Sequence, residues 1–85
     1  MLPVDGFVQA SVMTTLRHRL GKRLRKIRRN QDITQEQLAE AVGVTAETIS
    51  NIERGKAAPS FDTLERIAQV LQVPIKDFFD FPEDR

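Results

Sequence analysis

A very short gap between two helical segments constrains this chain more than any other feature. Thr34 opens the first segment with a T-x-x-Q pattern, which is typical of a capping box at a helix start. Gly43 ends that segment, because glycine tolerates the left-handed conformation that closes a helix. Thr45 can cap the next helix, expected over residues 46–54, and Gly55 stops it. A turn this short that contains glycine makes two helices cross steeply.

A steep helix crossing requires particular residue types around it, and the sequence contains them. Ala39 supplies a small side chain where the two helices approach most closely, and Gly43 supplies the unusual backbone angle of the turn. Apolar side chains must fill the angle between the helices. Suitable residues recur at helical spacings, namely Leu38, Val42, Val44, Ile49 and Ile52.

Three further helices are predicted around this pair. A first helix, ending near residues 30–32, is indicated by an apolar stripe of Leu16, Leu20, Leu24 and Ile27. Ser60 can cap a fourth helix, whose expected apolar face consists of Phe61, Leu64, Ile67, Ala68 and Leu71. Pro74 suits the first turn of a short fifth helix that holds Ile75, Phe78 and Phe79. No segment alternates with a period of two for long enough to form a strand, so the predicted fold class is all-α.

The composition of the chain excludes several classes of function. At 85 residues the chain fits one small domain. It has no cysteine and one histidine, so neither a disulfide framework nor a metal site is expected. An enzyme would need converging nucleophiles, acids or metal ligands, and the acids here are scattered along the helices. The sequence shows no signal peptide and no run of about 20 apolar residues, so a soluble, cytoplasmic protein without a membrane partner is expected.

The charges of the chain are unevenly distributed. Residues 6–31 contain no acid, and eight cations crowd this segment: Arg17, Arg19, Lys22, Arg23, Arg25, Lys26, Arg28 and Arg29. The C-terminal end is acidic instead. Such a chain can present one basic face to a polyanion and keep its acidic end away from it. The alternative interpretation is an ordinary solvated helix face.

The segment TQEQLAEAVGVTAETISNIERGK resembles the helix-turn-helix of the lambdoid phage repressor and Cro family. A glutamine, an alanine, a glycine and two isoleucines at set offsets carry the resemblance, which extends over nearly all of residues 16–79. It implies a compact five-helix DNA-binding domain, with the helix-turn-helix at the second and third helices. The domain is expected over residues 14–81, after an N-terminal extension of residues 1–13 and before an acidic tail of residues 82–85.

The resemblance also implies a function, namely sequence-specific binding of double-stranded DNA by a transcriptional regulator. The helix at residues 46–54 would lie in the major groove, where the implied base readers are Ala46, Glu47, Ser50 and Asn51. Asn51 can bond adenine in two places, and Glu47 can accept from a cytosine amino group. Alternatively, Glu47 only stabilises the first helical turn, and Ala46 is only a helix former.

A second implied set of residues contacts the DNA backbone. Gln35 stands at a helix start, where its side chain and the free N–H groups can meet a phosphate oxygen. The other residues placed to meet phosphates are Thr45, Thr48, Arg54 and Lys56, together with some cations of the first helix. Alternatively, Gln35 is an ordinary first-turn glutamine, Thr45 only caps its helix, and Arg54 is only solvated.

Arg28 and Glu53 receive a structural interpretation. Each residue borders an apolar stripe, and the two stripes must face each other. A salt bridge between the first and third helices is therefore predicted, and the resemblance implies such a pair at these positions. His18, which stands alone among arginines, is expected at the surface.

A second copy of the chain is the expected protein partner. A helix-turn-helix monomer touches about one half-site, so a homodimer on a palindromic operator is expected, with its recognition helices about 34 Å apart. Phe78 and Phe79 are expected to close the core, while other apolar residues lie outside the family fold: Leu2, Val4, Phe7, Val8, Val12 and Phe81. The alternative is disorder at both termini.

The sequence leaves other functions as alternatives. A protein-interaction module that kept the fold but lost DNA binding is disfavoured by Gln35 and by the basic first helix. Among DNA-binding roles, a repressor is favoured, and the alternative is an antitoxin or controller protein that also binds a partner protein. The sequence indicates no cofactor and no small-molecule ligand.

Overall fold

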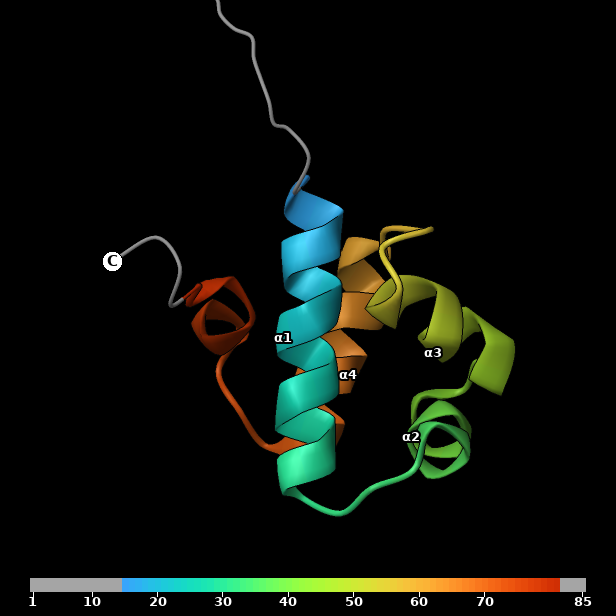
Figure 1. The fold of residues 1–85 in the computed structure, drawn as a ribbon. Helices are drawn as coiled ribbons and strands as arrows, with labels where there is room; N and C mark the ends of the chain where they lie inside the picture. Colours follow the sequence, from blue (N-terminus) through green and yellow to red (C-terminus); the bar gives the residue numbers. More distant parts are fainter. Residues whose placement is uncertain (1–14, 82–85) are drawn as a thin grey trace, which may run out of the picture.

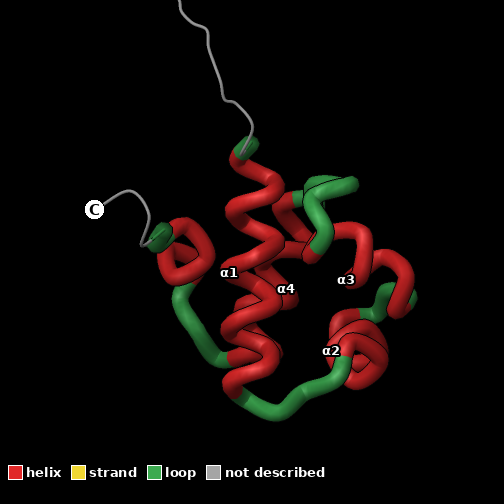
Figure 2. The backbone as a smooth tube through the Cα atoms, viewed as in Figure 1, coloured by secondary structure: helices red, strands yellow, loops and turns green. Residues whose placement is uncertain are grey.

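Four α-helices and a short 3₁₀ helix make up the described part of the chain. The computed structural model describes residues 15–81, so the 1–13 extension, with its apolar residues, and the 82–85 tail lie outside it. The helices in chain order are α1 (Leu16–Asn30), α2 (Gln35–Val42), α3 (Ala46–Glu53), α4 (Phe61–Leu71) and η2 (Ile75–Phe79). Residues 15–81 contain no strand (Figure 2). The all-α class is confirmed, but the expected fifth α-helix is the 3₁₀ helix η2.

The helices enclose one small core around α1. Figure 1 shows α2 and α3 on one side of α1 and η2 on the other, with α4 running behind α1. α1 packs against α3 and η2, while α2 packs against α3 and α4. The core consists of Leu20, Leu24, Ile27, Leu38, Ala39, Val42, Ile49, Ile52, Leu64, Ile67, Ala68, Leu71 and Phe78. No helix within residues 15–81 is long and apolar enough to cross a membrane.

Local hydrogen bonds fix the turn between α2 and α3. The Thr34 hydroxyl accepts from the Gln37 N–H at 3.0 Å, and the Gln37 side chain accepts from the Thr34 N–H at 2.9 Å, which completes the predicted capping box. Gly43 ends α2 in the left-handed conformation, with φ of 91°. Thr45 then caps α3 by accepting from the Thr48 N–H at 3.1 Å. These bonds set the direction in which α3 leaves the turn.

α1 approaches the end of α3 so closely that only a glycine fits between them. A methyl group at Gly21 would lie 2.7 Å from the carbonyl oxygen of Glu53 and closer still to that of Ile52. Gly21 was not predicted to be a contact point, because the apolar stripe of this helix does not include it. A glycine in mid-helix lowers stability relative to alanine. Its presence within α1 could therefore have indicated that another segment approaches the helix closely at this point.

The C-terminal aromatic residues pack differently from the expectation. Phe81 was expected outside the family fold, but it is only 9% exposed, and the Arg19 guanidinium lies 4.4 Å from its ring centroid. Phe79 was expected in the core and is 41% exposed. A 3₁₀ helix has three residues per turn, so Phe78 and Phe79 point about 120° apart, and only Phe78 is fully buried. Phe61, expected on the apolar face of α4, is 91% exposed, because it stands at the first position of the helix, one turn before the buried Leu64.

The end of α4 offers a test of backbone strain. Gln72 closes this helix in the left-handed conformation with φ of 58°, a region that favours glycine. Gln72→Gly is expected to raise the free energy of unfolding by about 0.5–1 kcal/mol, because the relief of strain exceeds the added entropy of the unfolded chain. Gln69→Gly, the same exchange within α4, should lower it by about 1 kcal/mol. Urea unfolding measures both, and effects of equal sign would contradict the assignment of strain to Gln72.

Candidate nucleic-acid interface

α3 divides into an apolar inner side and a polar outer side. Ile49 and Ile52 are buried in the core. Glu47 is exposed, and Ser50 and Asn51 are half-buried. Three of the four predicted base readers therefore present polar groups on one short helix.

Ala46 lies partly in the core. It was expected on the outer side of α3, but it is half-buried and packs against the core cluster. The physical reason is its spacing, because Ala46 stands three residues before the buried Ile49 and therefore shares one side of α3 with it. Only a part of its methyl group therefore remains available to a ligand.

Two threonines of the predicted phosphate set organise the start of α3. Thr45 caps the helix, and its hydroxyl oxygen also lies 3.0 Å from that of Thr48. Thr45 is exposed and Thr48 is half-buried. Each hydroxyl oxygen has two lone pairs and one hydrogen, so the cap does not use the whole bonding capacity of this pair.

The other end of α3 is closed by Gly55. This residue has φ of 75°, and the Lys56 N–H donates to the Asn51 carbonyl at 2.9 Å, as in a Schellman motif. The ring of His18 packs against Gly55, since a methyl group there would lie 2.6 Å from the His18 Cγ atom. His18 is exposed, as expected, but it also supports this turn. Arg54 and Lys56, predicted to contact phosphates, are both exposed around it.

A buried polar network joins α1, α2 and α3. The Arg28 Nε and Nη2 atoms donate to the two carboxylate oxygens of Glu53 at 2.6 and 3.0 Å. Arg28 also donates from Nη1 to the Ile33 carbonyl at 2.7 Å. The two charged residues are only 8% and 6% exposed. This bidentate pair therefore fixes the end of the polar helix α3 against α1.

Gln35 extends this network to the start of α2. Its side-chain Nε2 atom donates to a Glu53 oxygen at 3.0 Å, a contact that the sequence analysis did not foresee. An amide nitrogen carries two hydrogens, so one N–H remains for a further acceptor. Gln35 is half-buried and thus lies between the buried pair and solvent. No group of His, Asp and Glu residues within the described part of the chain is arranged to hold a metal ion.

Comparison with known proteins identifies the family to which this arrangement of helices belongs. The family model described as Helix-turn-helix matches residues 24–78, which is more than half of the chain. The chain belongs to the helix-turn-helix family of DNA-binding transcriptional regulators. The match contains the whole of α2, α3 and α4, together with the second half of α1.

Several members of the helix-turn-helix family resemble this chain over most of its length. PuuR, an HTH-type transcriptional regulator of Escherichia coli K12, is 40% identical over 63 residues, which cover 74% of this chain and 34% of PuuR. The chain thus spans about a third of that relative. The restriction-modification controller protein C.AhdI from Aeromonas hydrophila has a TM-score of 0.72 and 27% identity, with 74% of this chain and 96% of that chain covered. The P22 c2 repressor, solved with a synthetic operator, has a TM-score of 0.66 and 30% identity over 69% and 89% of the two chains.

The helix-turn-helix chain brings its predicted site residues together in two groups. Glu47, Ser50 and Asn51 lie along α3, while Gln35 lies beside Glu53 at the junction of the three helices. Among the three proteins named above, PuuR and the P22 c2 protein are regulators by name and none is named an enzyme.

Proposed function

We propose that this protein is a sequence-specific repressor that binds a palindromic operator as a homodimer in the cytoplasm. The observation that carries the proposal is the polar outer side of α3, held in a fixed direction by the Thr45 cap and by the buried Arg28–Glu53 pair. The major groove of B-DNA is about 12 Å wide and admits such a helix. A helix held by such contacts loses little freedom on binding, which lowers the cost of recognition.

Base recognition is assigned to the polar outer side of α3. Glu47, Ser50 and Asn51 present a carboxylate, a hydroxyl and an amide, and these groups match the donors and acceptors of base edges. Ala46 can offer only the exposed part of its methyl group to a thymine methyl. Asn51 is the strongest candidate, because a half-buried amide in mid-helix has no bond to the domain through its side chain among the described residues.

Phosphate contacts are assigned to residues around both ends of α3. Gln35 has one side-chain N–H left beside Glu53, and it stands at the start of α2, where helix dipole and backbone N–H groups favour an anion. Thr45 and Thr48 lie at the start of α3, and Arg54 and Lys56 lie at its end. Contacts at both ends of α3 would hold it in register with the bases.

An exposed apolar surface supports the homodimer. Phe61, Ile75 and Phe79 are exposed and line a hollow of about 300 Å³, together with Leu64 and the carboxylates Asp62 and Glu65 of α4. Exposed clusters of large apolar residues are typical of interaction sites. This surface replaces Phe81 as the support for dimerisation, because Arg19 and the domain cover Phe81.

A second candidate function is that of a controller protein, which would bind a partner protein in addition to DNA. The similarity to C.AhdI favours it, because the match covers 96% of that controller protein. The same apolar surface at Phe61, Ile75 and Phe79 would then be available to the partner protein. Selecting bound sites from random duplexes and measuring the mass of the complex in solution would distinguish a dimer on a palindrome from other assemblies.

Asn51 and Gln35 provide the test of this function. On a selected duplex, Asn51→Ala is expected to weaken binding by about 1–3 kcal/mol and to relax the base preference at one position. Gln35→Ala should weaken binding to all duplexes nearly alike, because a phosphate carries no sequence information. Competition with single base-pair variants measures both effects, and thermal unfolding controls for the lost bond from Gln35 to Glu53. If Asn51→Ala lost the same affinity for every duplex, Asn51 would not be a base reader.

A further inference from the structure

The eight cations of α1 have different surroundings, and three of them are held within the domain. Arg28 pairs with Glu53, and Arg23 donates from Nε to the Asp77 carbonyl at 2.7 Å. The guanidinium of Arg19 lies over the ring of Phe81. These three residues attach α1 to α3 and to η2 and the residues after it. The structural contacts thus explain only a part of the positive charge of this helix.

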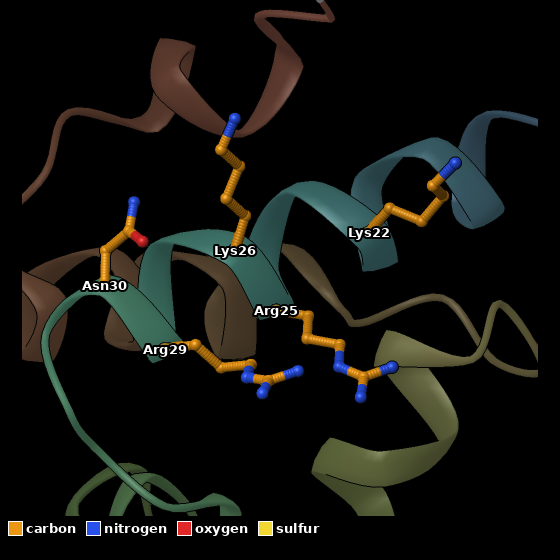
Figure 3. Close-up of a pocket in the computed structure, with 5 residues that line it drawn as sticks. All are labelled: Lys22, Arg25, Lys26, Arg29 and Asn30. Carbon is orange, nitrogen blue, oxygen red and sulfur yellow. The ribbon is translucent and has the colours of Figure 1, made fainter.

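Four of the remaining cations gather in one place. Lys22, Arg25, Lys26 and Arg29 line an open hollow of about 400 Å³ together with Asn30 (Figure 3). None of these cations has a hydrogen bond or an ion pair with another residue in the range 15–81. They stand three and four residues apart on one helix, and like charges at this spacing destabilise a helix by about 0.2–0.5 kcal/mol per pair. The cluster lowers the stability of the free domain, and a bound polyanion would offset that cost.

The four side chains extend in two directions. Figure 3 shows Arg25 and Arg29 on the side of α1 that faces α3 and α2, whereas Lys22 and Lys26 extend to the opposite side. On α1, Arg25 stands one turn before Arg28, which bonds Glu53 at the end of α3, and Arg29 follows Arg28 directly. Arg25 and Arg29 therefore border the junction at which Gln35 also meets Glu53.

We propose that Arg25 and Arg29 bind phosphates of the DNA backbone outside the half-site, beyond the phosphate assigned to Gln35. The proposal rests on the proposed function, since it extends the same DNA surface from α3 across the junction to α1. Two guanidinium groups one helical turn apart suit successive phosphates, because each guanidinium can donate two parallel hydrogen bonds to one phosphate. Lys22 and Lys26 remain outside this contact and act only through their charge.

Two double variants on the same helix test the proposal. Arg25→Gln/Arg29→Gln and Lys22→Gln/Lys26→Gln remove equal charge from opposite sides of the hollow. Binding to a selected duplex is measured over a range of salt concentrations. The arginine variant is expected to make the negative slope of log K against log[salt] shallower by about 1.8 per chain, since each lost phosphate contact accounts for about 0.9. The lysine variant should change this slope much less.

The length of the duplex supplies the second arm of the experiment. On a duplex trimmed to the selected site, the arginine variant and the wild type should bind with similar affinity, because the flanking phosphates are absent. On a duplex extended by several base pairs, the wild type should gain affinity and the arginine variant should not. An equal gain for both proteins would overturn the proposal.

The remaining outcomes separate this proposal from the proposed function. If the wild type preferred no duplex, the function itself would fail, and the assignment of Arg25 and Arg29 with it. A different outcome is that the wild type binds selectively and the salt dependence of binding becomes shallower by the same amount in both double variants. In that case only the assignment to Arg25 and Arg29 would fail. Thermal unfolding without DNA should show both variants at least as stable as the wild type, because like charges are removed. A clear loss of stability in the arginine variant would mark a structural role and would also overturn the proposal.

Discussion

Gly21→Ala is expected to destabilise the domain by about 2 kcal/mol or more, although alanine is the better helix former. The exchange should gain about 0.5–1 kcal/mol from helix propensity alone. The added methyl group, however, would lie 2.7 Å from the Glu53 carbonyl oxygen and would also meet the backbone of Ile52. Backbone cannot turn aside as a flexible side chain can, so α1 has to move away from α3, and overpacking of this kind costs about 1–3 kcal/mol, sometimes more.

Urea unfolding of Gly21→Ala and of two control variants measures this effect. Lys22→Ala, at the exposed neighbouring position, should change the free energy of unfolding by less than about 0.5 kcal/mol. Gly43→Ala adds a methyl group that has nothing within 4 Å, so its cost is only that of the left-handed backbone, about 1–2 kcal/mol. A Gly21→Ala protein as stable as the wild type would show that α1 and α3 are not in close contact at this point.

The arrangement of the helices was largely predictable from local signals. Thr34, Gly43 and Thr45 mark helix ends through bonds to their own neighbours, so these residues fix the ends of α2 and the start of α3 without any distant contact. The apolar stripes likewise indicate which side of each helix is buried. The pairing of Arg28 with Glu53 was predictable in the same way, since each residue borders an apolar stripe and the two stripes face each other.

The features that sequence reasoning missed depend on distant contacts. Gly21 is explained only by the backbone of α3, which is about 30 residues away in the chain. Phe81 is buried because Arg19 covers its ring, and no periodicity connects two residues so far apart. The bond from Gln35 to Glu53 belongs to the same class, because it joins two helix ends across the turn. Phe79 is a different case, because successive residues of any helix point to different sides, so Phe78 and Phe79 could not both face the core.

Breaking the Arg28–Glu53 pair is expected to have the largest effect on stability. Both residues are almost fully buried, so removal of either partner leaves a charge that neither water nor another ion compensates, at a cost of about 3 kcal/mol. In Glu53→Gln, Arg28 loses its counter-ion. In Arg28→Met, Glu53 keeps only the amide of Gln35, and the Ile33 carbonyl loses its donor. Thermal and urea unfolding without DNA should show a clear loss for each single variant.

The double variant decides whether the two residues act as a pair. Glu53→Gln combined with Arg28→Met should lose less than the sum of the single losses, because neither buried charge then remains alone. If Arg28→Met instead left stability unchanged and accelerated dissociation from DNA, Arg28 would be a phosphate ligand and its pairing with Glu53 would be incidental. If the pair holds α3, then Glu53→Gln should also relax the base preference of Glu47 and Asn51, although Glu53 contacts no base. The recognition helix would enter the groove at a less defined angle, and competition with single base-pair variants would detect the loss of selectivity.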